Sequence, residues 1–176
     1  SPYLVPFGLV VNPGATLTVE QGVELKFGNY ATLQVLGSLQ AQGVIFTSGA
    51  SAPEPGNWNG IVTGNDFHAG TVNLTDCEVK FYHECVVVKG QMNASNTSFS
   101  ESNAHGIVVT KSGSLQLTGG IIQTPSEYSF SYHSGIYADT SESVTVSGSS
   151  IRHFRNGVTG DHSNISLADI DIRDTY

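Results

Sequence analysis

Acidic and imidazole side chains are the groups in this chain that could hold a metal ion. Asp169, Asp171 and Asp174 lie close together, and hard cations such as Ca²⁺ prefer several carboxylate oxygens. Asp169 and Asp171 flank Ile170, however, and the alternation of a strand then points both to solvent. The six histidines include no pair at i and i+2 or i+4, the spacing that would place two Zn²⁺ ligands on one face. We therefore expect no metal site and no cofactor.

Acid and base chemistry on polysaccharides would need clustered aspartates, arranged around Ca²⁺ or as a catalytic pair, with a cation near the sugar carboxylate. The sequence shows no such cluster, and Arg152, Arg155 and Arg173 are its only guanidinium groups. We expect no catalytic residues and no enzyme activity. A fragment of a polysaccharide-active lyase or hydrolase is the alternative.

Two kinds of covalent modification remain open. Cys77 and Cys85 are eight residues apart, and either a disulfide or a buried reduced pair fits that spacing. Four Asn-X-Ser/Thr sequons become glycosylation sites if the source organism glycosylates its secreted proteins; they begin at Asn73, Asn93, Asn96 and Asn164. Asn73 and Asn93 occupy equivalent outward positions in adjacent repeats, so a ladder of stacked amides is the structural alternative.

Aromatic, histidine and arginine side chains recur two residues before a series of predicted corners, and also in an inserted segment over roughly residues 124–133. Side chains of these types are frequent at binding hot spots and sugar-stacking platforms. The candidate binding residues are Trp58, His83, Tyr128, Phe130, Tyr132, His133 and Arg155. The alternative is that the aromatic residues of the insertion only cover the wall of the fold.

The elements that position these candidates belong to a repeat written five times in the second half of the chain. Each unit has three apolar positions, and the first and third are always seven residues apart. The fifteen residues are Val72, Leu74 and Val79; Met92, Ala94 and Phe99; Leu115, Leu117 and Ile122; Val144, Val146 and Ile151; and Ile165, Leu167 and Ile172. A second column places glycine at four of five predicted corners, where it would adopt a positive φ angle; the column is Gly60, Cys85, Gly106, Gly135 and Gly157.

Apolar residues alternate with period two inside each unit, which predicts strands. The corners return every 21 to 29 residues, and such short coils can bury their inward side chains only by stacking about 4.8 Å apart. We predict an all-β fold, a right-handed parallel β-helix of about six to seven coils that is a fragment of a longer helix. A β-sandwich is the alternative, but the in-register columns disfavour it. Residues 1–176 form one domain, with opening coils of a different pattern and a Pro-rich loop over 1–57 and regular coils over 58–176.

Composition restricts the partners. Fifteen acidic against seven basic residues give a net charge of −8, so no basic field is available for nucleic acid. No apolar run approaches the ~20 residues of a membrane span, so we expect no direct membrane insertion of this fragment. Charged residues make up only 12%, and Gly, Ser, Thr and Asn are abundant, a composition typical of extracellular β-rich proteins.

The opening segment 12–28, Asn-Pro-Gly-Ala-Thr-Leu-Thr-Val-Glu-Gln-Gly-Val-Glu-Leu-Lys-Phe-Gly, resembles the first coils of the pectin-lyase-like right-handed β-helices, in particular their non-catalytic surface proteins. Segments 33–43, 45–47 and 58–61 continue that pattern, so the resemblance covers nearly the whole chain. It implies an extracellular or cell-surface module for adhesion, interaction or spacing, similar to those in bacterial adhesins and animal junction proteins of the bark-beetle type. The implied partner is a cell-surface protein or glycan.

Overall fold

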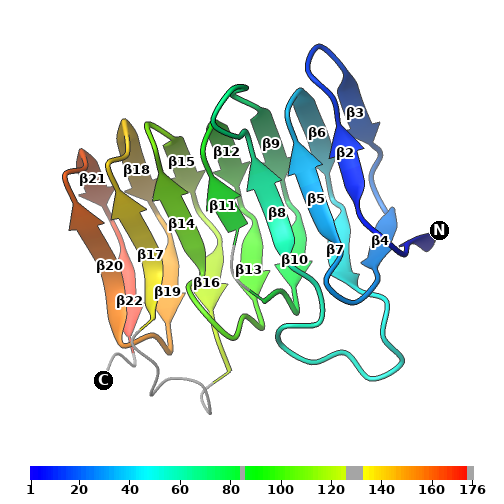
Figure 1. Cartoon of the computed structure of the whole chain (residues 1–176). Coiled ribbons are helices and arrows are strands. Elements are labelled where there is room, and N and C mark those ends of the chain that lie inside the picture. The colour runs from blue at the N-terminus through cyan, green and yellow to red at the C-terminus, as the bar shows by residue number, and fades with distance from the viewer. Residues whose placement is uncertain (84–85, 126–132, 174–176) are drawn as a thin grey trace.

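The chain forms a right-handed parallel β-helix, which confirms the predicted fold class (Figure 1). The structure, a computed structural model, describes residues 1–83, 86–125 and 133–173. Those residues form strands and turns and include no helix, and hence no helix that is long and apolar enough to cross a membrane.

Three parallel sheets form the walls of the solenoid, and each full coil contributes one strand to sheet B, then C, then A. Sheet A contains β1 (Tyr3–Val5), β4 (Glu24–Phe27), β7 (Ile45–Ser48), β10 (Glu78–Lys80), β13 (Ser98–Ser100), β16 (Ile121–Gln123), β19 (Ser150–Arg152) and β22 (Asp171–Arg173). Sheet B contains β2 (Leu9–Val11), β5 (Thr32–Val35), β8 (Gly60–Thr63), β11 (Val86–Val88), β14 (Ile107–Thr110), β17 (Ser134–Asp139) and β20 (Asn156–Asp161). Sheet C contains β3 (Thr16–Val19), β6 (Ser38–Gln42), β9 (Thr71–Thr75), β12 (Gln91–Ser95), β15 (Ser114–Thr118), β18 (Ser143–Ser147) and β21 (Ile165–Ala168). The described strands therefore make about seven coils, in agreement with the prediction.

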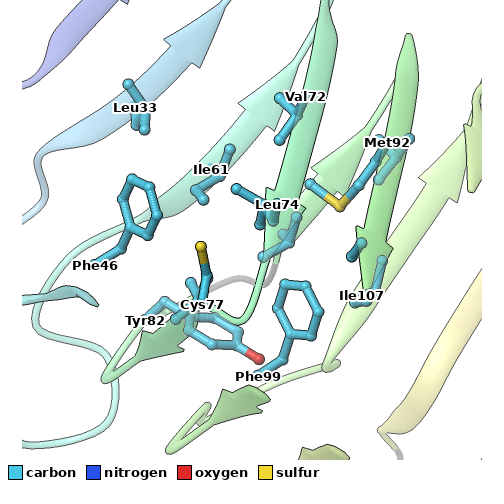
Figure 2. Packing of buried hydrophobic residues seen from close by; sticks show 14 of the residues in the cluster. Leu33, Phe46, Ile61, Val72, Leu74, Cys77, Tyr82, Met92, Phe99 and Ile107 are labelled. Carbon is cyan, nitrogen blue, oxygen red and sulfur yellow. The ribbon is translucent and has the colours of Figure 1, made fainter. Parts of the chain in front are cut away.

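The inward side chains stack in columns along the axis, as the repeat predicts. In sheet C the first apolar position of every unit pairs with that of the next, in the order Val72, Met92, Leu115, Val144 and Ile165. Figure 2 shows such side chains meeting between the sheets. Twelve of the fifteen repeat residues are buried; the other three, Ile165, Leu167 and Ile172, are at least partly exposed because the last described coil has a neighbour on one side only.

The same columns continue into the first half of the chain, where the sequence pattern looked different. Leu39 pairs with Val72, Ala41 with Leu74, and Phe46 with Val79. Leu39, Ala41 and Phe46 are buried, so they form a sixth copy of the repeat. The loop of residues 49–57 between β7 and β8 interrupts the spacing to the next corner and conceals the copy in the sequence.

The predicted glycine corners exist, but positive φ explains only one of them. Gly60 has a φ angle of +91°, whereas Gly106, Gly135 and Gly157 are absent from the residues with positive φ. At Gly106 an added Cβ would lie 2.3 Å from Cγ2 of Ile122, and at Gly135 it would lie 2.3 Å from Cγ2 of Ile151. These corners require glycine because a core side chain of sheet A occupies the space of a Cβ.

Residues with a positive φ angle, in the left-handed conformation, do turn the chain at a different corner, between sheets C and A. The residue that follows each strand of sheet C from β6 onward has a φ angle between +48° and +69°; these residues are Gly43, Asp76, Asn96, Gly119, Gly148 and Asp169. Gly, Asn and Asp are the residues that best tolerate this conformation. The corner therefore gives Asn96 and Asp169 a structural role, although the sequence suggested a sequon and a Ca²⁺ ligand for them.

Candidate functional site

The most developed cluster of titratable side chains lies where β17 begins. It is at the side of sheet B formed by the N-terminal ends of its strands, which we call the edge of sheet B. The His105 and His133 rings have their centroids 5.1 Å apart, and the His105 and Tyr137 rings stack at 5.2 Å. Nδ1 of His105 accepts a hydrogen bond from the backbone N–H of Ser134 at 2.9 Å. Ser134 is itself buried, with its hydroxyl 2.8 Å from Oγ1 of Thr159. The cluster thus links three consecutive coils through side chains.

Trp58 is not part of this surface, and its prediction as a binding residue is wrong. Its side chain is fully buried, stacks on Phe27 at a centroid distance of 4.3 Å, and donates from Nε1 to the carbonyl of Lys80 at 2.8 Å. The bridge partner of Trp58 is Tyr82, which is also buried, and not His83. The predicted column was displaced by one residue here, and in an extended chain that moves a side chain from the outside to the inside.

The other predicted binding residues divide into two groups. His133 and Arg155 directly precede strands of sheet B, and His83 lies three residues before β11. His133 belongs to the cluster described above. His83 and Arg155 both have interaction partners in the structure. Tyr128, Phe130 and Tyr132 lie outside the described residues. Sequence reasoning missed His105, because the residue two positions before the Gly106 corner is Ala104. It also missed Tyr137, whose only signal is its outward position two residues after the Gly135 corner.

Burial sets the protonation state of the histidine pair. Desolvation lowers the pKa of His105, and the neighbouring charge that His133 would carry lowers it further. Desolvation also lowers the pKa of His133, and its Nδ1 atom is buried with no hydrogen-bond partner in the described structure. Both imidazoles are therefore held neutral at a pH where an ordinary histidine begins to take up a proton.

We expect the folded protein to lose stability as the pH falls below about 6.5, the ordinary histidine pKa. Both histidines have folded-state pKa values below the unfolded value, so protons bind preferentially to the unfolded chain in that range. Melting temperatures measured between about pH 7.5 and pH 5 check this. Replacing His105 and His133 by glutamine should flatten the pH dependence, whereas replacing the exposed His68 and His162 should not. An unchanged slope in the first variant would contradict the assignment.

The sequons lie on exposed or partly exposed backbone, and two of them form the predicted amide ladder. Nδ2 of Asn93 donates to Oδ1 of Asn73 at 2.8 Å, across adjacent strands of sheet C. Asn96 donates to Oδ1 of Asp76 at 3.3 Å, and Asn164 donates to the carbonyl of Glu142 at 3.2 Å. The amide nitrogens of Asn93, Asn96 and Asn164, which a glycan would modify, thus each have a structural partner, whereas Asn73 takes part through its amide oxygen. Use of the sequons stays a prediction.

In a host that glycosylates secreted proteins, at most one of Asn73 and Asn93 should be fully occupied on a given molecule. The two amides are in hydrogen-bond contact, and two glycans would start about 4.8 Å apart on neighbouring strands. Intact-mass and glycopeptide analysis of the secreted protein measures the joint occupancy, with the separate Asn164 sequon as the internal control. Full occupancy of both sites on single molecules would contradict the ladder.

Cys77 is a free and buried thiol, so the reduced alternative holds for this residue. Its Sγ atom lies 3.2 Å from the carbonyl of Thr75 and 3.5 Å from that of Ala41, and burial raises the pKa of the thiol. A thiol kept protonated in this way is a poor nucleophile. Its suggested disulfide partner, Cys85, lies outside the described residues.

Among the acidic residues near the C-terminus, Asp171 forms ion pairs with two arginines. Oδ1 of Asp171 lies 2.7 Å from Nε of Arg173, and Oδ2 lies 4.0 Å from an Nη atom of Arg152. Asp174 lies outside the described residues. Within residues 1–83, 86–125 and 133–173 no three His, Cys, Asp or Glu side chains come together as a metal site would require.

The edge of sheet B can therefore present neutral imidazole, phenol and guanidinium groups to a partner, on a backbone fixed by parallel strand pairing on both sides. Comparison of the chain with protein-family models, curated proteins and solved structures finds no match in any of the three.

Proposed function

We propose that this β-helix is a non-enzymatic interaction module of a larger extracellular or cell-surface protein, and that it meets its partner through the edge of sheet B around His105, His133 and Tyr137. The observation that carries the proposal is the packing of these three rings across adjacent coils, with His105 stacked on Tyr137 and edge-to-face with His133. Preorganised aromatic rings contribute to binding at little cost in conformational entropy. The partner that suits such an edge is a cell-surface protein or glycan.

The setting of the module is part of the proposal. The low share of charged residues, 12%, favours an extracellular protein, and stacked parallel coils with left-handed corners support membership of the pectin-lyase-like superfamily. In a solenoid, each coil contacts only its neighbours, so such a module also sets a fixed distance between the segments that flank it. Adhesion and spacing are thus compatible roles of one molecule.

Binding of the fluorescently labelled protein to the surface of cells from the source organism tests the proposal. The edge variant His133→Ala/Tyr137→Ala should bind at least about tenfold more weakly, since truncation of hot-spot residues costs more than 1 kcal/mol each. The matched control Tyr30→Ala/His68→Ala removes the same residue types from exposed positions elsewhere and should bind like the wild type. If the edge variant bound as tightly as the wild type and had the same melting temperature, the binding role of this edge would be rejected and only the spacing role would remain.

A polysaccharide-active enzyme fragment is the second candidate, and the same histidine pair is the observation that favours it. An imidazole held neutral by its surroundings is suited to act as a general base near neutral pH. Release of reducing ends or unsaturated products from polygalacturonate and from neutral glycans tests it. Activity that disappears in His133→Ala would replace the binding proposal, and no turnover by the wild type would reject this candidate.

A further inference from the structure

The outward face of sheet C differs chemically from the faces of the other two sheets. Its central row runs in register along all seven strands and consists of Thr18, Gln40, Asn73, Asn93, Gln116, Thr145 and Ser166. The two flanking rows of the same strands add serine, threonine and glutamine, ending on Ala168. On these seven described strands no outward side chain is charged.

Charges are instead concentrated on the outward face of sheet A. Its strands carry Glu24, Lys26, Glu78, Lys80, Arg152, Asp171 and Arg173. Lys80 and Glu78 pair at 2.9 Å, and Arg173 and Asp171 pair at 2.7 Å. Although the whole chain has a net charge of −8, the strands of sheet C present a neutral wall of amide and hydroxyl groups.

Sheet C is also hollowed along its length. Three adjoining depressions of about 420, 200 and 190 Å³ follow one another from Thr18 to Thr145. The first two share Asn73 and Thr75, and the second and third share Asn93 and Gln116. The first two lie between the central row and the row that contains Thr75 and Ser95, whereas the third lies on the other side of Asn93 and Gln116. We call this hollowed face, which follows the solenoid axis, the amide groove; Glu20 at one end is its only charged lining residue among those described.

The amide groove retains hydrogen-bonding capacity. Asn93 uses one amide hydrogen on Asn73, and Ser95 bonds to Thr75 at 3.3 Å, so these rungs are fixed relative to one another. Gln40 and Gln116 are exposed and have no hydrogen-bond partner in the described structure. Each amide offers two donors and an acceptor in fixed directions, repeated at the strand spacing of about 4.8 Å.

This chemistry selects among the classes of ligand. Nucleic acid requires cations, which the groove lacks. Protein interfaces are centred on aromatic, Met and Arg anchors and are poor in Ser, whereas the groove is built of amides and hydroxyls. A neutral polymer that carries donors and acceptors at a regular interval matches it, because each added rung repeats the same weak contacts and multiplies their effect.

We propose that the amide groove binds an extended, uncharged polysaccharide whose chain runs along the solenoid axis. The site lies on a different sheet from the ring cluster of the proposed function, contains no acid and base pair for bond cleavage, and holds hydroxyl-rich chains by direct hydrogen bonds. Lacking aromatic platforms, it binds each sugar weakly and depends on chain length.

Affinity electrophoresis in native gels that contain hydroxyethyl cellulose, galactomannan or polygalacturonate tests the proposal. The wild type should be retarded by at least one of the two neutral polymers and not by the anionic one. The groove variant Gln40→Ala/Asn93→Ala/Gln116→Ala should show about tenfold weaker retardation or more. The matched control Asn12→Ala/Gln123→Ala/Asn156→Ala removes three amides from other surfaces and should migrate like the wild type.

Four results would overturn the proposal. They are no retardation of the wild type by either neutral polymer, equal retardation of the groove and control variants, and loss of retardation in His133→Ala/Tyr137→Ala, which would place binding on sheet B. The fourth is self-association of the wild type in sedimentation velocity that the groove variant abolishes while neutral polymers retard neither, because the groove would then be a contact between copies. Unchanged retardation of the His133→Ala/Tyr137→Ala variant supports a site independent of the proposed function.

Discussion

Phe99→Asp should yield no folded protein. Phe99 is fully buried on β13 and lies among other core side chains (Figure 2). It pairs in register with Val79 of the preceding coil and Ile122 of the following one. Removing the ring alone would cost about 3–5 kcal/mol, and a carboxylate without a partner in the same space adds several more. The sum approaches the whole stability of an ordinary domain, about 5–15 kcal/mol.

The neighbouring residue provides the control for that experiment. Ser100 is the next residue along the strand, but its side chain points outward, and it pairs in register with Lys80. Ser100→Asp should therefore fold and melt within about 2 °C of the wild type. Circular dichroism and thermal melting of the soluble fraction distinguish the two variants. A soluble Phe99→Asp protein with the wild-type melting temperature would refute the inward assignment of this column.

The repeat could be predicted from sequence because it depends on backbone geometry alone. Strand period fixes which residues face inward, and parallel stacking fixes which of them touch, so the columns through Met92 and Phe99 follow from spacing. The copy at Leu39, Ala41 and Phe46 escaped because the loop of residues 49–57 separates it from the next corner. An insertion changes the number of residues between two copies of the repeat without changing which side chains stack on one another.

The candidate site was predicted less well because it depends on turns, where the strand period no longer applies. Trp58 and Tyr82 both point inward before sheet B and close the core, and a rule that counted two residues back from each corner could not show this. The pairing of His105 with His133 joins residues that are 28 positions apart on two turns of different length. The register of β14 and β17 aligns residues that are 29 positions apart, so the two rings lie in neighbouring columns and a search for equivalent positions does not pair them.

The amide groove was partly visible in the sequence, since Asn73 and Asn93 were predicted to stack and do so. Its extent was not, because the row passes through Gln40, Gln116 and Thr145, residues that have no common side chain. What they share is neutrality and exposure on one sheet. Such a property becomes apparent only after the register has assigned every outward residue to its wall.

Substitution of a glycine at the corners before sheet C should also strongly lower the stability of the protein. Gly70 precedes β9, and an added Cβ would lie 1.9 Å from the carbonyl oxygen of Val35 and 2.8 Å from its carbonyl carbon. That oxygen accepts the backbone N–H of Gly64 at 2.7 Å, while the carbonyl of Gly70 accepts from Gln91 in the next coil. Because all these atoms are backbone, no rotamer change can make room for the methyl group, and two coils must move apart.

Gly70→Ala should consequently destabilise the protein by about 3 kcal/mol or more, which lowers the melting temperature by about 6–12 °C in a chain of this size. Gly22→Ala is the matched control, because Gly22 has a φ angle of +80° but nothing within 4 Å of the added Cβ. It isolates the cost of placing an L-residue in the left-handed region, about 1–2 kcal/mol. Thermal melting of both variants at one pH compares the two costs directly. If Gly22→Ala proved as destabilising as Gly70→Ala, the corner would require glycine for its flexibility and not for the close approach of neighbouring coils.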